Sequence, residues 1–279
     1  MNRKWQNYED EVYEECCRIY GEENVDRNVS KVGISSQVPR QIDVLVHSEE
    51  GDIAYDAKYY SKRVDVKTIE AMIGMYGDLG VEKFVVVTNK GYSKAALRRA
   101  HLGKDNVEAD VLSLGELQRM QGYGAVPYAG RNGILLSPPF GWIVDGQRSA
   151  HPEMLAVLYR RGLGFGEAMR KEREFAYLVL WDKDDEIHTI QGLAEFHRDV
   201  SMEVDTEGKW EILEEEPYTI TRFKHSKAVD EYIGYREFEN FILSVVLFCE
   251  EEKWSRDKTK LQYILRRAMP MHVKQYKEK

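Results

Sequence analysis

Two aspartates and a lysine carry the chemistry that this sequence suggests. Asp43 lies in the alternating stretch 41–46, and Asp56 and Lys58 lie in the alternating stretch 53–60. Asp56 and Lys58 are two residues apart, so in a β-strand their side chains emerge on the same face of the sheet. Carboxylates on neighbouring strands form the oxygen-rich kind of site that Mg²⁺ prefers. A lysine beside them can orient or deprotonate an attacking water, or neutralise charge on a phosphate oxygen, so the set suits phosphodiester hydrolysis.

An acid-x-lysine triplet is common by chance, and only its context separates one occurrence from the others. Four such triplets end at Lys58, Lys67, Lys209 and Lys253. The triplet at Lys58 lies inside an alternating strand whose neighbour also carries an acid. Asp65 of the second triplet opens a helix, and the last two triplets fall in a turn and at a helix end. The candidate site therefore depends on the strands around it.

Helices and strands alternate in the first half of the chain. Apolar periodicity predicts them in this order: a helix over 8–20, a hairpin over 41–46 and 53–60, a helix over 66–76, a strand over 84–88, a helix over 93–102 and a strand over 107–112. Ser113 and Glu116 form a capping box for a short helix after the last strand. This order predicts an α/β fold, an α/β/α sandwich with a mixed sheet.

A change of composition divides the chain. Glycine and proline punctuate 123–150, which we interpret as a connector between a domain over 1–122 and a second domain over 151–279. In the second domain the pattern predicts a helix from Pro152 to Tyr159, strands over 175–181, 187–204 and 210–223, and helices over 229–252 and 257–269. Strands followed by helices indicate an α+β domain, to which we assign a recognition or regulatory role.

Several short motifs of the first domain point to one family when they are taken in order. They are Tyr8-Glu9, Gln41-Ile42-Asp43, Asp56-Ala57-Lys58-Tyr59, Val64-Asp65-Val66 and Val87-Thr88-Asn89-Lys90-Gly91-Tyr92-Ser93-Lys94-Ala95-Ala96. Over about residues 5–120 the chain resembles the catalytic domain of Mrr-type restriction endonucleases, a branch of the PD-(D/E)xK nuclease superfamily. The resemblance implies Mg²⁺-dependent cleavage of DNA, with Mn²⁺ able to substitute, in restriction or antiviral defence.

The resemblance also assigns roles to individual residues. It makes Asp43 and Asp56 the metal ligands and Lys58 the residue that handles the attacking water. Two positions depart from the family pattern. Ile42 precedes the first acid where the superfamily motif has proline, and Asp56 replaces the usual glutamate with a side chain one methylene shorter.

The family further implies a glutamate on the first helix. Four candidates are present, Glu9, Glu11, Glu14 and Glu15. Spacing from the apolar residues places Glu9 on the buried face of the helix and the other three on the opposite face. We therefore expect Glu9 to assist the metal or the water. The alternative interpretation is an acid that stabilises the start of the helix through the dipole.

Three polar residues of the first domain are candidates for contact with a nucleic acid. Gln41 precedes Asp43 by two positions and can hydrogen-bond phosphate, although a polar residue at a strand edge explains it equally well. Thr88 ends the apolar strand and Ser93 begins a helix, so both can contact backbone phosphate through hydroxyl and amide groups. For Ser93, helix capping is the favoured interpretation.

The net charge of −8 contrasts with the basic excess that phosphate binding usually produces. Basic residues are instead concentrated at the carboxyl end, on a predicted helix and tail that include Lys258, Lys260, Arg266 and Arg267. These side chains could track a phosphate backbone, or they could form an ordinary solvated face. Part of the acid excess is the site itself, where bound Mg²⁺ would cancel charge. We expect weak, salt-sensitive DNA binding that improves with divalent metal.

Composition excludes several other classes of protein. The chain is 43% hydrophobic, which excludes a disordered tail protein, and its three cysteines form neither a disulfide framework nor a zinc motif. Its apolar runs are far shorter than the roughly 20 residues of a membrane span, and it begins without a signal peptide pattern. We expect a soluble, cytoplasmic protein with no membrane association.

Two further questions stay open at this point. The resemblance implies a homodimer, because cutting two strands takes two sites. The alternative to an active enzyme is a catalytically weak or inactive nuclease-fold protein that acts as a nucleic-acid-binding or scaffolding module. The shorter acid at Asp56 is the observation that supports this alternative.

Overall fold

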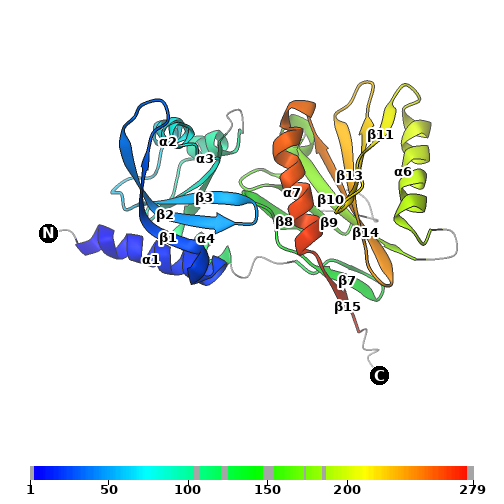
Figure 1. The fold of residues 1–279 in the computed structure, drawn as a ribbon, viewed down its shortest axis with the longest axis horizontal. Coiled ribbons are helices and arrows are strands. Elements are labelled where there is room, and N and C mark those ends of the chain that lie inside the picture. Colours follow the sequence, from blue (N-terminus) through cyan, green and yellow to red (C-terminus); the bar gives the residue numbers. More distant parts are fainter. Residues whose placement is uncertain are drawn as a thin grey trace. The chain divides into compact units, whose positions relative to one another are not determined.

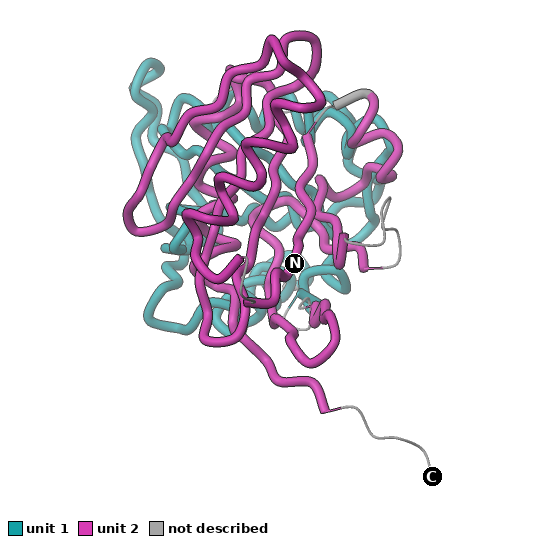
Figure 2. Tube along the Cα trace, turned by 90° about the vertical axis from the view of Figure 1, so that its right-hand side faces the viewer, with its two compact units in different colours: residues 1–123 teal, residues 124–279 magenta. Residues whose placement is uncertain are grey.

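A five-stranded mixed sheet forms the centre of the first of two units, Met1–Tyr123 and Gly124–Lys279, into which the chain divides (Figures 1 and 2). The computed structural model describes residues 3–102, 107–120, 125–146, 154–172, 174–183 and 187–274. The mixed α/β class is the one that the sequence predicts.

The strands of the first unit lie in the sheet in the order in which they occur in the chain. They are β1 (Val25–Val32), β2 (Pro39–Ser48), β3 (Gly51–Lys58), β4 (Lys83–Thr88) and β5 (Glu108–Ser113). β1, β2 and β3 pair antiparallel, whereas β3, β4 and β5 pair parallel. β4 lies between β3 and β5 and all six of its residues are buried, which explains why residues 84–87 are apolar on both faces.

Four helices pack in two pairs around this sheet. They are α1 (Arg3–Tyr20), α2 (Val66–Asp78), α3 (Lys94–His101) and α4 (Leu114–Arg119), with a short 3₁₀ turn, η1 (Glu22–Asn24), after the first. α1 contacts β1, β2, β3 and α4, whereas α2 contacts α3. Apolar residues of α2 join Phe84 and Val86 of β4 in one core cluster. On α1, Val12 and Cys16 are completely buried.

Local sequence signals determine where these helices begin. The Asp65 side chain accepts a hydrogen bond from the Thr68 amide and caps α2. Ser93 caps α3 in the same way, and Ser113 with Glu116 forms the predicted capping box of α4. β1 was not predicted, because its sequence is mostly polar. It is an edge strand that pairs only with β2, so few of its residues need to be buried.

The second unit is built on a seven-stranded antiparallel sheet in the order β11-β12-β13-β14-β10-β9-β8. Its strands are β8 (Trp142–Asp145), β9 (Ala156–Arg160), β10 (Phe175–Asp182), β11 (Lys209–Glu214), β12 (Thr219–Lys224), β13 (Asp230–Glu237) and β14 (Phe241–Cys249). A small sheet joins β6 (Tyr128–Ala129), β7 (Asn132–Leu135) and β15 (Met269–His272). The helical segments are α5 (Phe165–Glu167), η3 (Ala168–Glu172), α6 (Ile190–Val204), η4 (Glu251–Lys253) and α7 (Trp254–Arg267).

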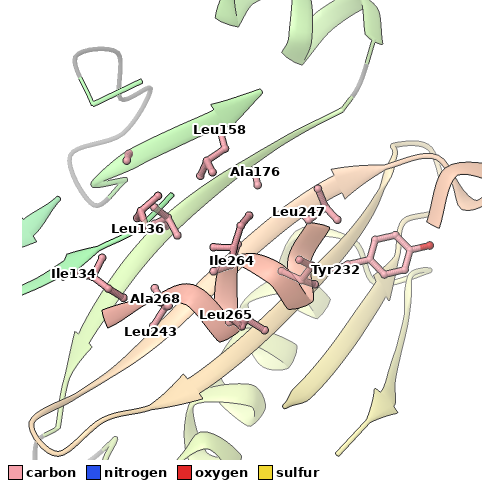
Figure 3. Packing of buried hydrophobic residues seen from close by; sticks show 14 of the residues in the cluster. Ile134, Leu136, Leu158, Ala176, Tyr232, Leu243, Leu247, Ile264, Leu265 and Ala268 are labelled. Carbon is pink, nitrogen blue, oxygen red and sulfur yellow. The ribbon is translucent and has the colours of Figure 1, made fainter. Parts of the chain in front are cut away.

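Two helices cover the larger sheet. α7 packs Leu261, Ile264 and Leu265 into the largest core cluster of the unit, together with Leu243 and Leu247 of β14 (Figure 3). α6 packs Leu193 and Ala194 against a separate cluster that contains Ile242 and Val246. Alternate residues of β14 belong to the two clusters, so the two helices lie on opposite faces of the sheet. No helix in the described part of the chain is long and apolar enough to cross a membrane.

Several predictions for the second unit are wrong. The segment 229–252, predicted as a helix, forms the hairpin of β13 and β14. Helices cover both faces of β14, so nearly all its residues are apolar and the period-two signal disappears. The segment 187–204, predicted as strand, contains α6, which Thr189 caps by accepting a hydrogen bond from the Gly192 amide. Gly192 lies in the first turn, where it does not break the helix.

The region between the two predicted domains also differs from the prediction. Most of the connector expected at 123–150 belongs to the second unit, because β6, β7 and β8 form there. The helix predicted from Pro152 to Tyr159 is instead strand β9 from Ala156 onward, and Pro152 itself lies outside the described residues. Five apolar or basic residues, all buried, make up β9.

Candidate active site

The hairpin of β2 and β3 opens where the candidate acids lie. Its register runs from Ser48 opposite Gly51 to Val44 opposite Tyr55, and the pairing stops there. Asp43 and Asp56 are the next residues on the two strands. The Asp43 carboxylate instead accepts a hydrogen bond from the Ala57 amide, with Oδ2 2.9 Å from the nitrogen. This side-chain bond holds the first acid against the strand that carries the second.

Asp56 is an acid in an unusually dry position. Only 5% of the residue is exposed, so its oxygens need partners inside the protein. Oδ1 forms an ion pair with the Lys58 ammonium group, and Oδ2 accepts a hydrogen bond of 3.2 Å from the Tyr76 hydroxyl. Tyr76 comes from α2, where its ring stacks on Phe84 with centroids 4.6 Å apart. The helix thereby fixes the orientation of the second acid.

The charges of these groups act on one another. Burial and then the negative charge of Asp56 raise the pKa of Asp43 to about 6, against the opposing effects of the Ala57 amide and Lys58. Burial acts to lower the pKa of Lys58, but the charge of Asp56 and the contact with it outweigh burial and raise that pKa above its usual value. Two acids therefore share one partly buried space with one cation, an arrangement that an additional cation would stabilise.

Glu9 on α1 belongs to the same electrostatic group. Burial raises the pKa of this carboxyl, and the charges of Lys58 and Asp56 both act on it. Glu11 and Glu14 are exposed, as predicted. The prediction for Glu15 is wrong, because it is 4% exposed and forms an ion pair with Arg18. Glu15 follows the buried Val12 by three positions, so both lie on the buried face of α1.

The oxygen donors present fit magnesium better than zinc. Asp43 and Asp56 supply carboxylate oxygens, and Mg²⁺ is usually bound by one or two carboxylates and keeps several waters. Among the residues that the structure describes, no three or more His, Cys, Asp or Glu side chains are grouped so that they could hold a metal ion. A closed zinc site needs four protein ligands, commonly Cys and His. Asp43 and Asp56 supply the two carboxylates that a magnesium site of this kind uses.

The three polar candidates of the first unit have different surroundings. Thr88 lies opposite Lys58 in the register of β3 and β4, but it is fully buried and its hydroxyl accepts a hydrogen bond from the Lys90 amide. Ser93 caps α3, which agrees with the favoured interpretation. Gln41 is exposed, and its side-chain amide donates to Asn28 Oδ1 on β1 at 2.8 Å.

The basic candidates of α7 are not equivalent. Lys260 is 1% exposed, with its ammonium nitrogen 3.8 Å from an Asp257 oxygen, so the predicted contact with phosphate is wrong for this residue. It lies one turn before Ile264, on the face of α7 that packs on the sheet. Lys258 forms an ion pair with Glu214. Arg266 and Arg267 are exposed at the end of α7, and the basic tail over 275–279 lies outside the described residues.

Sequence reasoning missed two residues that act on the site. Tyr76 belongs to the apolar stripe that predicts α2, and nothing in that stripe indicates that its hydroxyl meets a carboxylate. Arg27 lies on the unpredicted strand β1, pairs with Asp10 and lowers the pKa of Glu9 through its charge. The guanidinium carbon of Arg27 also lies 5.5 Å from the centre of the Tyr13 ring on α1.

Comparison with known proteins relates the first half of the chain to one family. Residues 8–133 match the model of a family described as restriction endonuclease, the Mrr catalytic domain. This match confirms the resemblance that the motifs indicate. The chain has no match among curated proteins.

Three solved structures show distant similarity to the chain. A protein of unknown function, AF1548, is 15% identical with a TM-score of 0.32, over 39% of this chain and 61% of its own. PsbP (CyanoP) from Synechocystis sp. PCC 6803 is 12% identical with a TM-score of 0.33, over 51% and 89%. LpqN of Mycobacterium tuberculosis, involved in cell envelope biogenesis, is 10% identical with a TM-score of 0.34, over 53% and 90%.

Proposed function

We propose that this protein is a Mg²⁺-dependent endonuclease that hydrolyses phosphodiester bonds in DNA, of the Mrr-like type and active in restriction or antiviral defence. The observation that carries the proposal is the approach of Asp43 to the strand of Asp56 and Lys58 where the hairpin opens. The family match over residues 8–133 supports a restriction-type nuclease independently of this geometry. The second unit would supply recognition or regulation.

Each residue of the site has a distinct task in this proposal. Asp43, oriented by the Ala57 amide, and Asp56, oriented by the Tyr76 hydroxyl, would hold Mg²⁺. When bound, the ion supplies Lewis acidity toward the phosphate and lowers the pKa of water. Lys58 keeps its proton at neutral pH because the pKa of its ammonium group is raised. It therefore stabilises charge on a phosphoryl oxygen and orients the attacking water rather than deprotonating it.

Glu9 is the residue available to receive a proton. It is partly exposed, and burial raises the pKa of its carboxyl. A raised pKa makes a carboxylate a better proton acceptor near neutral pH. Glu9 would therefore assist the water that attacks the phosphorus atom.

Cleavage of plasmid DNA tests the proposal. Purified protein is incubated with supercoiled plasmid, with methylated plasmid and with RNA, in Mg²⁺, Mn²⁺ or EDTA. We expect metal-dependent conversion of supercoiled plasmid to nicked or linear plasmid, and we expect this conversion to disappear in Asp43→Asn and in EDTA. Nicked plasmid before linear plasmid indicates independent cuts, whereas direct linearisation indicates two copies acting together. Cutting that survives in both EDTA and Asp43→Asn rejects the proposed site.

One observation favours a second candidate function, a nuclease-fold protein that binds nucleic acid without cutting it. Both oxygens of Asp56 already have partners inside the protein, Lys58 and Tyr76. A metal would have to displace or share these contacts, and the side chain of Asp56 is one methylene shorter than glutamate. DNA binding without cutting, in either metal and with every substrate, supports this second function.

A further inference from the structure

β1 and β2 continue beyond the rest of the sheet as a two-stranded ribbon. Their register runs through Val29 opposite Ile42, Ser30 opposite Gln41, Lys31 opposite Arg40 and Val32 opposite Pro39. β3 pairs with β2 only from Val44 onward. Residues 29–42 therefore form a hairpin, here called the ribbon, that ends next to Asp43 (Figure 1). Its strand β2 leads directly from solvent into the candidate site.

The tip of the ribbon has a fixed conformation. Asp78 at the end of α2 accepts hydrogen bonds through Oδ1 from the amides of Ser35 and Ser36, at 2.8 and 3.1 Å, and through Oδ2 from the Ser36 hydroxyl. The Asp78 carbonyl accepts from the Ile34 amide at 2.7 Å. A Cβ atom at Gly33 would collide with the Asp78 carboxylate and the Ser36 hydroxyl, so a larger residue there would displace the side chains that hold the tip. The tip is held by α2.

This rigid tip presents apolar side chains to solvent. Val32, Ile34 and Val38 are 55%, 67% and 45% exposed. Single exposed apolar residues are ordinary, but three on one fixed turn form a small patch. Ile34 has one neighbour in the fold, since its Cδ1 lies beside Gly80, but most of its surface is exposed, so the patch fits contact with another molecule.

The ribbon also carries two cations directly opposite each other. Lys31 and Arg40 face each other across the two strands, so both side chains emerge on the same face. Like charges in this position destabilise a strand pair. The carboxylate of Asp78 on α2 interacts with the charge of Arg40, and a bound phosphate would balance the pair further. Arg40 is exposed and Lys31 is partly exposed. The two cationic side chains are suited to contact the phosphate backbone of a nucleic acid together.

We infer that the ribbon docks in the major groove of duplex DNA, next to the site at Asp43. A two-stranded β-ribbon fits the width of the major groove. Lys31 and Arg40 would contact phosphates, and the tip at Val32, Ile34 and Val38 would pack on apolar groups of the groove such as thymine methyls. The inference rests on the proposed function in one respect, since it takes the substrate to be DNA.

Binding measurements on the full chain test the ribbon separately from catalysis. Fluorescence anisotropy is recorded with a labelled duplex and with one of its single strands, first in EDTA and then with Mg²⁺ in the Lys58→Ala background, at several salt concentrations. We expect Lys31→Ala with Arg40→Ala to weaken duplex binding about tenfold, and to reduce the slope of log affinity against log salt by about 2. Binding of the single strand should change much less. The control combines Lys67→Ala with Lys209→Ala, two exposed residues, and removes the same charge.

The apolar tip has its own test. Ile34→Ser should weaken duplex binding several-fold without changing the salt slope, because no charge is removed. Light scattering on the same proteins tests a second copy of the chain as the occupant. If Ile34→Ser lowers the oligomer mass and leaves duplex binding intact, the tip is a self-association surface and the inference fails.

The remaining outcomes separate this inference from the proposed function. If the variant with Lys31→Ala and Arg40→Ala binds duplex as well as the control does, groove docking is overturned. The same holds if its affinities for single strand and for duplex fall equally. If ribbon binding behaves as expected but no variant or metal produces cutting, the nuclease proposal fails and the ribbon assignment stands.

Discussion

The Asp43 carboxylate lies 2.9 Å from the Ala57 amide nitrogen, at the point where β2 and β3 cease to pair. This hydrogen bond to a side chain takes the place of a backbone hydrogen bond between the two strands. It connects the two acids, because Ala57 directly follows Asp56. Because Ala57 lies between Asp56 and Lys58, movement of any one of these residues would disturb the others. The site is therefore positioned by strand geometry before any metal binds.

Metal affinity should depend on pH through Asp43. Burial and the charge of Asp56 raise the pKa of this carboxyl to about 6, and a carboxyl must lose its proton to ligate a metal. Affinity for Mn²⁺ should rise about tenfold per pH unit below 6 and become constant above about 7. Calorimetric titrations between pH 5 and 8 measure this dependence. Equal affinity at pH 5 and 7.5 would contradict the role of Asp43.

The stability of the metal-free protein should respond in the opposite direction. The pKa of Asp43 is raised in the folded state, so its contribution is fully present below pH 3.8 and is lost as the pH rises through about 6. Above pH 6 the variant Asp43→Asn should therefore unfold with a free energy about 1–2 kcal/mol larger than the wild type in EDTA. Urea titrations at pH 7.5 and pH 4 compare the two proteins. If Asp43→Asn is less stable than the wild type at pH 7.5, the Asp43 carboxylate is not repelled by its neighbours.

Tyr76 should affect the metal as well as the fold. Tyr76→Phe removes the hydrogen bond to the buried Asp56, which should cost about 1–3 kcal/mol of unfolding free energy and about tenfold in metal affinity. Tyr55→Phe is the matched control, because Tyr55 is also fully buried and its hydroxyl is 2.7 Å from that of Tyr20. The control should lose stability but keep its metal affinity. If both variants lose affinity equally, Tyr76 has only a structural role.

A buried ion-pair network should determine the acid stability of the second unit. Glu174 is 3% exposed and contacts Arg160 and Arg256. Burial acts to raise the pKa of Glu174, but the two guanidinium groups, together with the charges of Lys260 and Lys253, lower it to about 2. Its contribution to stability is therefore present above about pH 4.5 and is lost as the pH falls toward 2.

Substitution of Glu174 checks this network. Glu174→Gln should destabilise the protein by about 3–5 kcal/mol at pH 7, because it leaves buried cations without a counter-charge. Glu211→Gln removes an exposed partner of Arg222 and should change stability by less than about 1 kcal/mol. Thermal unfolding at pH 7 and pH 3 measures both. Equal effects at the two positions would mean that the Glu174 pair is not isolated from solvent.

The fold of the first unit was largely predictable because its signals are local. Caps at Asp65, Ser93 and Ser113 mark three helix starts, and the strands alternate or are wholly apolar according to their place in the sheet. The same signals bring Asp43, Asp56 and Lys58 together, because a hairpin fixes which residues face one another. β1 escaped prediction because a polar edge strand has no distinctive periodicity.

The rest depends on contacts that sequence spacing does not contain. β14 is apolar on both faces because α6 and α7 cover them, so its sequence lacks the alternation that marks a strand. Those helices come from distant segments of the chain. Lys260 was expected in solvent and is buried beside Asp257, because charge alone does not show which face of α7 packs on the sheet. The Tyr76 contact with Asp56 joins residues from a helix and a strand, and only the folded structure reveals it.

The rate of cutting by a matched pair of lysine variants tests the central claim most directly. Lys58 and Lys67 each end an acid-x-lysine triplet, but only Lys58 pairs with the buried Asp56, whereas Lys67 is exposed on α2. Single-turnover cleavage of plasmid in Mg²⁺ should slow by about 100-fold or more in Lys58→Ala and remain at the wild-type rate in Lys67→Ala. Equal rates for the two variants would contradict the assignment of this site as the catalytic centre.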